Sequence, residues 1–352
     1  MKLLLDNIIF SLQKMGGISV VWKNIIMALH KSTIPYECWE YSGFKNNIVR
    51  KEMEPFNHLF KWSRTLFIER YINPIVRIKK PFIFHSSYYR ICLNNNAINI
   101  TTVHDFTYEK FNKGLSAWVH KIQKYYAIRH SDFIVCISYN TKKDLLKYMP
   151  DIDPLKIRVI YNGVSNDYHP VKTNRWDHLG EYVVFVGSRQ PYKQFDFTVR
   201  ALKDTTYKLV IVGGELNDKE RFFLHETLGE ERYYYTGFLT NAELNELYNQ
   251  ALCLSYPSVY EGFGIPVLEA QRAGCPVIAY NASSIPEVIG DRTLLMDNLS
   301  IDEFHSKLQL LRNDAVRNTI IETGLRNSHK YSWEKMGHEY VELYKEIMTK
   351  FH

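Results

Sequence analysis

The stretch from Cys253 to Tyr280 passes through an apolar segment, a loop containing Gly262, Gly264 and Pro266, a helical pattern and a second apolar segment. Two strands joined by a helix in this way form a parallel pair, because the helical crossover returns the chain to the same end of the sheet. Ligands bind such sheets at the carboxyl ends of the strands, where this loop lies. The stretch therefore predicts an α/β fold with a binding loop in front of the helix.

Strand-like runs alternate with helical patterns along the whole chain. With 352 residues the chain is long enough for two domains of ordinary size. The polar segment 165–181 predicts the linker, so one Rossmann-like domain is expected at 1–165 and another at 166–333. The last segment, 332–351, has the pattern of an amphipathic helix. The strands are predicted at 3–10, 81–87, 98–104, 132–138, 157–164, 182–187, 208–214, 253–258 and 276–280.

Charge is distributed unevenly between the two halves. The net charge is +6, but residues 1–165 hold 24 Lys and Arg against 12 Asp and Glu, whereas residues 166–352 hold 20 against 26. A basic first half suits an anionic partner such as phospholipid headgroups, a diphosphate-linked acceptor or nucleic acid. The basic residues form no known nucleic-acid-recognition motif, so nucleic acid is not expected as a partner.

Hydropathy and cysteine content exclude two further classes. No apolar run approaches the roughly 20 residues that a membrane-spanning helix needs. Asp6 interrupts the N-terminal apolar run, which is interpreted as a first strand and not as a signal peptide. The five cysteines are scattered without any C-x-x-C pair, which argues against a disulfide framework and a zinc site and favours the cytoplasm.

Two glutamates flank the glycine-containing loop. Pro266 suits the first helical position, and the loop before it presents backbone N–H groups that suit a phosphate. Glu269, one turn inside the helix, could accept hydrogen bonds from ribose hydroxyls, and Glu261 could meet the sugar end of the same ligand. The alternative is that both are surface or capping carboxylates.

Two cations follow the strand that ends at Gly187. Arg189 and Lys193 are four residues apart just past the strand's carboxyl end, where two positive charges suit a diphosphate. The alternative for this pair is an ordinary solvated face.

The first half contains two weaker signals. His104 and Asp105 end a strand and would face the ligand crevice, although Asp105 could instead cap a turn while His104 packs. Gly16 and Gly17 precede a helix and would let the backbone approach an anion, but a lone glycine pair is not specific.

Taken together, these residues resemble the large family of GT-B-fold retaining glycosyltransferases, family 4 (glycosyl transferases group 1). The resemblance covers the second half almost continuously and the first half more thinly, through Gly16-Gly17 and His104-Asp105. The shared motifs are E-G-F-G-I-P-V-L-E at 261–269, G-S-R-x-x-x-K at 187–193, N-G-V at 162–164 and S-S-I-P-E-V at 283–288.

The resemblance implies two Rossmann-like domains facing across a cleft. The acceptor domain would comprise residues 1–165 with 334–352, because the terminal helix crosses back in this fold, and the donor domain would comprise 166–333. Arg189 and Lys193 would hold the donor diphosphate and stabilise the charge on the leaving nucleotide.

The other motif residues would surround the same donor. Glu269 would bind its ribose, His104 would contact the transferred sugar, and Gly16 with Gly17 would close over the phosphates. The remaining positions would hold the sugar and phosphates mainly through their backbone, namely Gly187, Glu261, Gly262, Phe263, Gly264 and Ile265.

The expected reaction is the transfer of a hexose, with retention at the anomeric carbon, to a glycan or lipid-linked glycan in surface polysaccharide or lipopolysaccharide synthesis. The first expectation for the donor is GDP-mannose, followed by a UDP-hexose. No D-x-D signature is present, so neither a metal nor another cofactor is expected. The alternatives are a non-catalytic nucleotide or sugar sensor and a glycoside hydrolase.

The segment Lys45 to Lys80 contains nine Lys and Arg and three acids, interleaved with aromatic residues. A basic, aromatic surface suits docking on an anionic membrane, so peripheral contact with the inner face of the cytoplasmic membrane is expected. The alternative is a plain solvated helix. The aromatic and large apolar residues interleaved in the segment Lys45 to Lys80 are Phe56, Phe60, Trp62, Phe67, Tyr71 and Ile72.

Overall fold

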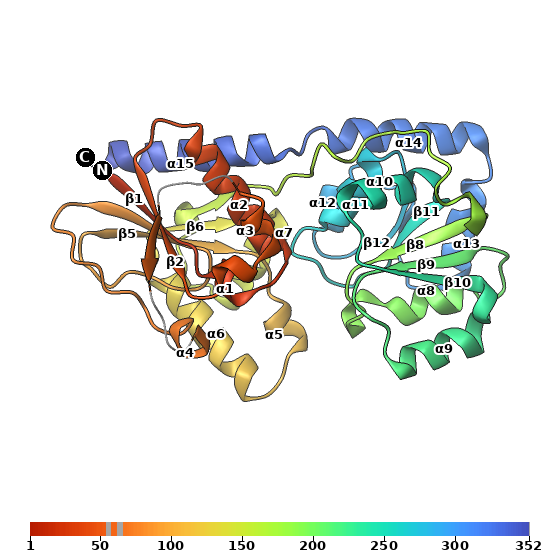
Figure 1. Ribbon diagram of the computed structural model, residues 1–352, viewed down its shortest axis with the longest axis horizontal. Coiled ribbons are helices and arrows are strands. Elements are labelled where there is room, and N and C mark those ends of the chain that lie inside the picture. Colours follow the sequence, from red (N-terminus) through yellow and green to blue (C-terminus); the bar gives the residue numbers. More distant parts are fainter. Residues whose placement is uncertain (54–57, 62–65, 352) are drawn as a thin grey trace. The chain divides into compact units, whose positions relative to one another are not determined.

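The computed structural model describes residues 1–53, 58–61 and 66–351. The chain divides into two compact units, unit 1 (Met1–Gly163 with Trp333–His352) and unit 2 (Val164–Ser332). Each unit is a parallel sheet with helices on both faces (Figure 1), which confirms the α/β class with two Rossmann-like halves. The boundary predicted from the sequence lies two residues from this division.

In the described part of unit 1 the sheet has seven strands in the order β3-β2-β1-β4-β5-β6-β7. They are β1 (Lys2–Asp6), β2 (Tyr36–Tyr41), β3 (His58–Lys61), β4 (Phe82–Ser86), β5 (Ala97–Val103), β6 (Phe133–Cys136) and β7 (Ile157–Val159). The helices are α1 (Ile9–Leu12), α2 (Gly17–His30), α3 (Ile48–Lys51), α4 (Leu66–Glu69), α5 (Thr107–Phe111), α6 (Leu115–Arg129), α7 (Tyr139–Tyr148) and α15 (Trp333–Lys350). The predicted first strand was too long, because the chain turns after β1 and begins α1.

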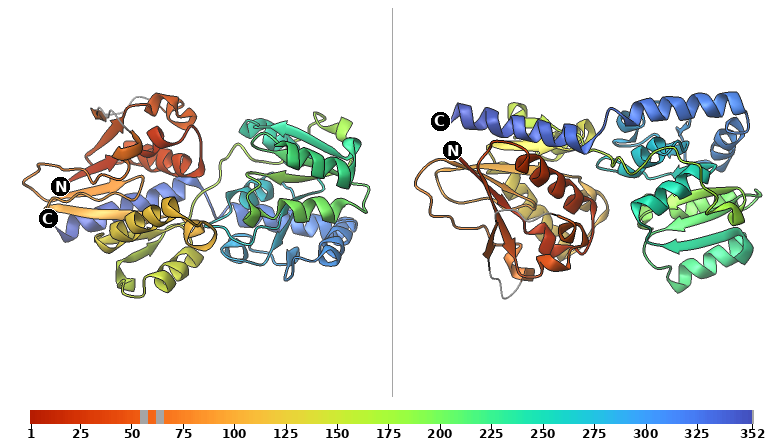
Figure 2. Two further views of the ribbon diagram at one scale, coloured as in Figure 1. Left: turned by 90° about the horizontal axis from the view of Figure 1, so that it is seen from below. Right: turned by 45° about the horizontal axis from the view of Figure 1, so that its top comes forward.

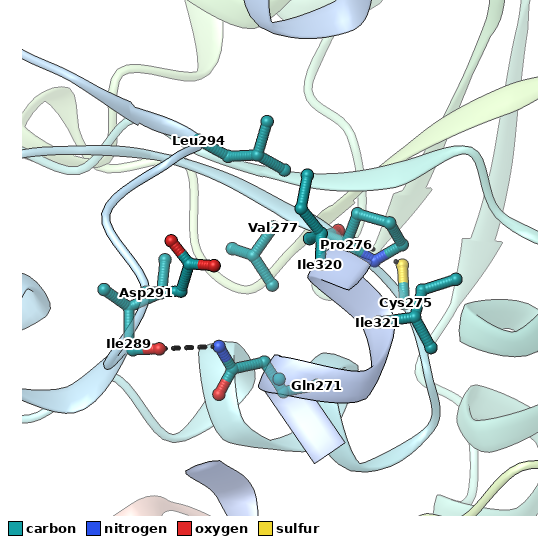
Figure 3. Close-up of a pocket in the computed structure, with 10 residues that line it drawn as sticks. Gln271, Cys275, Pro276, Val277, Ile289, Asp291, Leu294, Ile320 and Ile321 are labelled. Atoms are coloured by element: carbon teal, nitrogen blue, oxygen red, sulfur yellow. Dashed lines mark hydrogen bonds between the residues drawn. The ribbon is translucent and has the colours of Figure 1, made fainter. Parts of the chain in front are cut away.

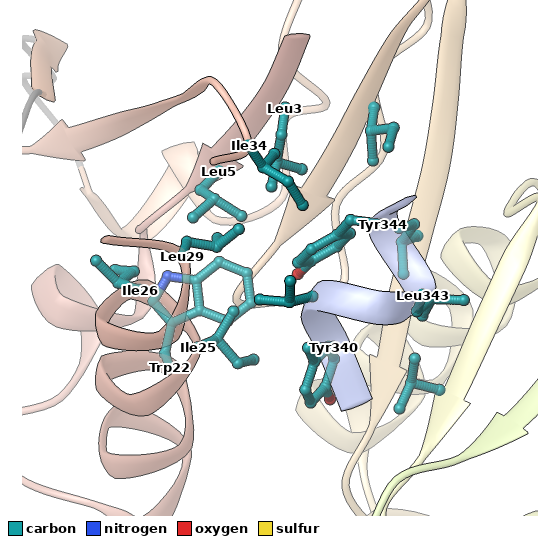
Figure 4. Packing of buried hydrophobic residues seen from close by; sticks show 14 of the residues in the cluster. Leu3, Leu5, Trp22, Ile25, Ile26, Leu29, Ile34, Tyr340, Leu343 and Tyr344 are labelled. Atoms are coloured by element: carbon teal, nitrogen blue, oxygen red, sulfur yellow. The ribbon is translucent and has the colours of Figure 1, made fainter. Parts of the chain in front are cut away.

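The core of unit 1 joins the two ends of the chain. Trp22 of α2 and Tyr340 and Tyr344 of α15 lie in one buried cluster that covers one face of the sheet (Figure 4). A Cβ on Gly337 would lie 2.5 Å from the Cβ of Ala28, so α15 and α2 approach closely at that point. The prediction that the terminal helix returns to the N-terminal domain is confirmed.

In unit 2 the sheet has six strands in the order β10-β9-β8-β11-β12-β13. The strands are β8 (Tyr182–Val186), β9 (Lys208–Val212), β10 (Tyr233–Gly237), β11 (Cys253–Tyr256), β12 (Val277–Tyr280) and β13 (Leu295–Met296). The helices are α8 (Phe195–Leu202), α9 (Asp218–Leu228), α10 (Asn241–Gln250), α11 (Ile265–Arg272), α12 (Ile285–Val288), α13 (Ile301–Leu310) and α14 (Asp314–Ser328).

The helices of unit 2 cover both faces of its sheet, as the further views show (Figure 2). Phe195 of α8, Leu224 of α9 and Phe304 of α13 share one buried cluster with the strands, so these helices cover the same face. A capping box between Thr240 and Glu243 begins α10, as the sequence predicts.

Gly213 lies where β8 and β9 end side by side. Its φ is +142°, and a Cβ there would lie 2.7 Å from the backbone oxygen of Gly187. Because backbone atoms cannot move aside cheaply, we expect Gly213→Ala to reduce the free energy of unfolding by about 2 kcal/mol. Urea denaturation measures this loss. Gly214→Ala is the matched control, since a Cβ there meets nothing within 4 Å, and equal losses in the two variants would contradict the argument.

Candidate active site

Most of the predicted site residues of unit 2 lie on loops at one edge of its sheet, and Ile265 and Glu269 lie on the helix that follows one of these loops. Strand β8 pairs in parallel with both β9 and β11, so the carboxyl ends of these three strands meet at the same edge. Gly187 directly follows β8, with a φ of +112° that favours glycine. The loop after β11 leads into α11. The sheet thus brings the segments around Arg189, Lys193 and Glu261 to one edge.

Lys193 and Glu261 form an ion pair at this edge. The Lys193 Nζ donates to Glu261 Oε1 at 2.6 Å, and the two side chains are only 15% and 11% exposed. The Tyr256 hydroxyl also hydrogen-bonds to Glu261. Lys193 ends a short 3₁₀ turn, Pro191–Lys193, that places it here. The alternatives of a solvated face for Lys193 and of a surface position for Glu261 are therefore wrong.

Arg189 has different partners from Lys193. Its Nε donates to Glu220 Oε1 at 2.8 Å and its Nη2 donates to the backbone oxygen of Glu215 at 2.6 Å. The side chain is only 7% exposed, and Nη1 is buried without a hydrogen-bond partner among the described residues. Buried donors are nearly always paired in folded proteins, so Nη1 is a candidate donor for a ligand oxygen. Sequence reasoning missed Glu220, whose signal in the sequence is the capping box with Asn217 that begins α9.

The loop between Glu261 and α11 is fixed by contacts with Ser284 and Ile285. Gly264 has a φ of +103°, and a Cβ on it would lie 2.8 Å from Ile285 Cδ1. The Ser284 Oγ lies 3.0 and 2.9 Å from the backbone oxygens of Glu261 and Phe263, which share its single O–H donor. The backbone of Gly262–Ile265 is therefore fixed at the start of α11, whose N-terminus favours an anion. The helix begins at Ile265, so the first helical position predicted for Pro266 is wrong by one residue.

Glu269 lies on α11, apart from Glu261, as the glycines and proline between them predict. Burial raises the pKa of its carboxyl to about 7, and a hydrogen bond from Tyr168 lowers this pKa in part. The Tyr168 hydroxyl also faces Asn241 Oδ1 at 3.3 Å. The Glu269 carboxyl is therefore close to half ionised at neutral pH. Sequence reasoning missed Tyr168, which lies in the segment expected to be a linker.

His104 and Asp105 follow β5 in unit 1. The pKa of His104 is lowered to about 4, mainly by burial, while the carboxylate of Asp105 opposes this shift and the cation of Lys124 adds to it. His104 is therefore neutral at physiological pH. Asp105 accepts a hydrogen bond from the Thr107 backbone at 2.9 Å, so the turn-capping alternative is confirmed for Asp105.

The glycine pair lies at the start of α2 in unit 1. Gly16 is the N-cap with extended backbone at φ 170°, and Gly17 is the first helical residue. The pair therefore does not wholly precede the helix as expected. A Cβ on Gly16 would meet the Gln13 side chain, whereas one on Gly17 would meet nothing within 4 Å.

The basic segment from Lys45 to Lys80 is not one surface. Arg50 is buried and bonds to Glu40 through Nε at 2.6 Å, and Arg70 donates to the Tyr88 hydroxyl. The described part contains α3, β3 and α4, so the alternative of one plain helix is wrong, whereas the expected membrane contact stays a prediction. Within the described ranges no helix is long and apolar enough to cross a membrane. Phe56 and Trp62 lie outside the described residues, as do the side chains of Phe60 and Phe67.

A small cavity lies elsewhere in unit 2, between α11, α14 and β12 (Figure 3). Its volume of about 20 Å³ is enough for one water molecule and too small for a nucleotide. Gln271, whose Nε2 donates to the backbone oxygen of Ile289 at 2.8 Å, lies on its wall. None of the predicted site residues lines this cavity. Among the described residues, no group of three or more His, Cys, Asp or Glu side chains is arranged to hold a metal ion.

Curated proteins of known name align with parts of the chain. The O-antigen chain mannosyltransferase B of Escherichia coli is 31% identical over 173 residues, which are 47% of this chain and 45% of that protein. An uncharacterized glycosyltransferase of Methanocaldococcus jannaschii is 30% identical over 227 residues, 63% of this chain and 62% of that protein. The chain thus spans less than two thirds of the length of both relatives.

The fold matches solved structures over almost the whole chain. The crystal structure of HepE from Anabaena in complex with UDP-glucose has a TM-score of 0.74 at 16% identity, covering 98% of this chain and 100% of HepE. Two family models match the sequence in succession: Glycosyltransferase Family 4 at residues 15–168 and Glycosyl transferases group 1 at residues 171–327. The chain belongs to the group 1 glycosyl transferases, family 4, and has their GT-B fold.

Proposed function

We propose that the chain transfers a hexosyl residue from a nucleotide-sugar to a glycan acceptor, with the donor bound at the loops of unit 2. The observation that supports this most is the buried Lys193–Glu261 pair beside the backbone of Gly262–Ile265 at the start of α11. Such a cluster of one cation, one carboxylate and the N-terminus of a helix suits a sugar diphosphate, which has both hydroxyls and anionic oxygens.

In the proposed reaction, breaking the bond between sugar and phosphate leaves negative charge on the nucleoside diphosphate. Fixed cations that face this charge are usually the largest stabilising term in such sites. Lys193 and Nη1 of Arg189 are the proposed hydrogen-bond donors to the oxygens of this diphosphate. Glu269 would hold the ribose hydroxyls, and neutral His104 of unit 1 would hydrogen-bond the transferred sugar.

The proposed donor is GDP-mannose, from which mannose is transferred, and the alignment with an O-antigen mannosyltransferase supports this choice. A UDP-hexose is the alternative, supported by HepE, which was solved with UDP-glucose. The acceptor would be a glycan or lipid-linked glycan of surface polysaccharide synthesis in the cytoplasm. We also propose that the transfer retains the configuration at the anomeric carbon and needs no metal ion. Loss of activity in EDTA would contradict the independence from metal.

The proposal is tested by the melting temperature of the purified chain in EDTA with GDP, UDP, ADP, dTDP or CMP. A nucleotide present at 100 times its dissociation constant adds about 2.7 kcal/mol of stability, which raises the melting temperature measurably. We expect GDP or UDP to do so. If no nucleotide raises the melting temperature, the nucleotide-sugar proposal fails and a sensor of another ligand becomes the better account.

A further inference from the structure

Near its start, unit 2 has a connector, residues 167–171, that forms neither helix nor strand and is bound by side chains of α10. The His169 N–H donates to Asn245 Oδ1 at 2.9 Å, and the Val171 N–H donates to Asn249 Oδ1 at 2.8 Å. Asn249 Nδ2 donates in return to the backbone oxygen of His169 at 3.0 Å. Side-chain amides of α10 therefore pair backbone groups of the connector as a neighbouring strand would.

The asparagines that bind the connector share one side of α10. Asn241, Asn245 and Asn249 are each four positions apart, a spacing that places them in one row along a helix. Asn241 Nδ2 donates to Asp167 Oδ2 at 2.8 Å, so the row contacts the connector from its first residue onward. An amide side chain both donates and accepts, which lets it pair with either kind of backbone group. The row therefore fixes the connector at several points along its length.

The connector places the side chain of Tyr168 against Glu269 of α11. Tyr168 is only 3% exposed, and its hydroxyl hydrogen-bonds to the Glu269 carboxyl and lies 3.3 Å from Asn241 Oδ1. Burial and the neighbouring carboxylate raise the pKa of Tyr168 well above its usual range, so the hydroxyl keeps its proton. This single O–H can donate to Glu269 when the carboxyl is ionised, and to Asn241 when Glu269 is protonated.

Two further tyrosines face Glu269 from other elements. Burial and nearby carboxylates raise the pKa of Tyr248 on α10 and of Tyr256 on β11, so both are neutral. The Tyr256 hydroxyl bonds to Glu261, and the Tyr248 hydroxyl has no hydrogen-bond partner among the described residues. Of these three tyrosines, Tyr168 is the one that hydrogen-bonds to Glu269. Because a buried hydroxyl costs free energy unless it is paired, this contact accounts for a tyrosine where a phenylalanine would fill the same space.

We propose that Tyr168, seated by the asparagine row of α10, is a positioning residue that holds the Glu269 carboxylate in place to accept the ribose hydroxyls of the donor. Its hydrogen bond uses one lone pair of the carboxylate and leaves the others for the ribose. The bond also favours the ionised form, which is the form that accepts. The inference rests on the proposed function in one respect, namely that ribose is the ligand of Glu269.

The variant that tests the proposal is Tyr168→Phe, which removes the hydroxyl and keeps the ring. Its matched control is Tyr182→Phe, because Tyr182 is 1% exposed in the same unit and its hydroxyl donates to the backbone oxygen of Leu247 at 2.8 Å. Each change removes one buried hydrogen bond, so both variants should lose stability to a similar extent. Only the first change reaches Glu269.

Urea denaturation of the unliganded variants between about pH 5 and about pH 9 gives the first measurement. Without the Tyr168 hydroxyl the ionised carboxylate is less favoured, so the folded chain keeps the Glu269 proton to higher pH. The pH-dependent fall in stability, which ends near the Glu269 pKa of about 7 in the unchanged chain, should extend upward by about one pH unit in Tyr168→Phe. It should not extend in Tyr182→Phe. The same pH dependence in both variants would overturn the inference.

Calorimetric titration with the nucleoside that binds the unchanged chain gives the second measurement. Tyr168→Phe should bind about fivefold more weakly than the unchanged chain near pH 7 and within about twofold of it near pH 8.5, where both carboxylates are largely ionised. Comparing the two proteins at the same pH cancels any titration of the base. An equal loss of affinity at every pH would indicate a merely structural role for Tyr168 and would contradict the proposal.

Asn249→Ala tests the asparagine row, because it releases His169 and Val171 without changing Tyr168 or Glu269. It should shift the pH profile of affinity in the same direction as Tyr168→Phe, and an unshifted profile would show that the row does not seat Tyr168. The two measurements also separate this inference from the proposed function. If the unliganded variants differ as expected but no nucleoside binds the unchanged chain, the proposed function fails while the hold of Tyr168 on Glu269 stands.

Discussion

Replacing Lys193 by alanine should lower kcat by about a hundredfold. Each charge-assisted hydrogen bond to a developing anion is worth about 1.5–3 kcal/mol, which corresponds to about one to two orders of magnitude in rate. The upper end is expected here because the change also removes the partner of Glu261, a side chain only 11% exposed. The unpaired carboxylate would then repel the leaving diphosphate.

Steady-state kinetics measures this effect, with a nucleotide-sugar whose nucleotide raises the melting temperature of the chain as the donor. Lys219→Ala is the control, since Lys219 is an exposed lysine of the same unit. Lys193→Ala with Glu261→Gln should recover part of the lost rate if repulsion by the unpaired carboxylate contributes. A Lys193→Ala variant with unchanged kcat and unchanged melting temperature would show that Lys193 does not act on the donor.

Replacing Glu269 by glutamine should weaken nucleotide binding by about ten- to a hundredfold and remove a pH dependence. The carboxylate can accept from both ribose hydroxyls, and charge-assisted bonds are each worth about 1.5–3 kcal/mol. The pKa of about 7 means that only the ionised fraction binds in this way. Affinity should therefore rise as the pH increases through 7 and level off above it.

The stability of the unliganded chain should change in the opposite direction. Glu269 has a pKa of about 7 in the folded chain against an ordinary value of 4.5. Between these values the folded chain holds a proton that the unfolded chain has released, so this group's contribution to stability falls as the pH rises from 4.5 to 7. Thermal unfolding of the unliganded chain over this range measures the stability, and calorimetric titration with the nucleotide measures the affinity. Glu269→Gln at each pH is the control in both, because it retains the titration of all other groups, including the nucleotide's own phosphates. A parallel pH dependence in both proteins would contradict this role of Glu269.

The fold followed from the sequence where local signals were strong. Glycines end β8 and β9, and the capping box at Thr240 starts α10, so these elements of unit 2 had their own boundary signals. The edge strands β10 and β13 were not predicted. The first strand was predicted too long because Ile8, Ile9 and Phe10 are as apolar as β1 itself. Their burial in a turn and a short helix depends on the sheet and on α2, which no local pattern reveals.

The site was predicted only in part. The separation of Glu261 from Glu269 followed from the glycines and proline between them. The partners of Arg189 could not be predicted, because Glu220 lies on a different loop–helix segment that only the pairing of β8 with β9 brings near. Tyr168 was missed for the same reason, since its contact with Glu269 spans a hundred positions of sequence.

The exposure of the cations in the basic segment from Lys45 to Lys80 could not be predicted. A count of charges does not show which arginines are buried, and Arg50 is neutralised by Glu40 inside unit 1.

The donor site is tested most directly by calorimetric titration of three proteins in EDTA: the unchanged chain, Lys193→Ala and Glu269→Gln. Each is titrated with the nucleoside diphosphate that stabilises the chain and with the corresponding nucleoside. We expect Lys193→Ala to weaken binding of the diphosphate but not of the nucleoside, and Glu269→Gln to weaken binding of both. Equal binding of both ligands by all three proteins, or no binding of any nucleoside diphosphate, would contradict a donor site built from Lys193 and Glu269.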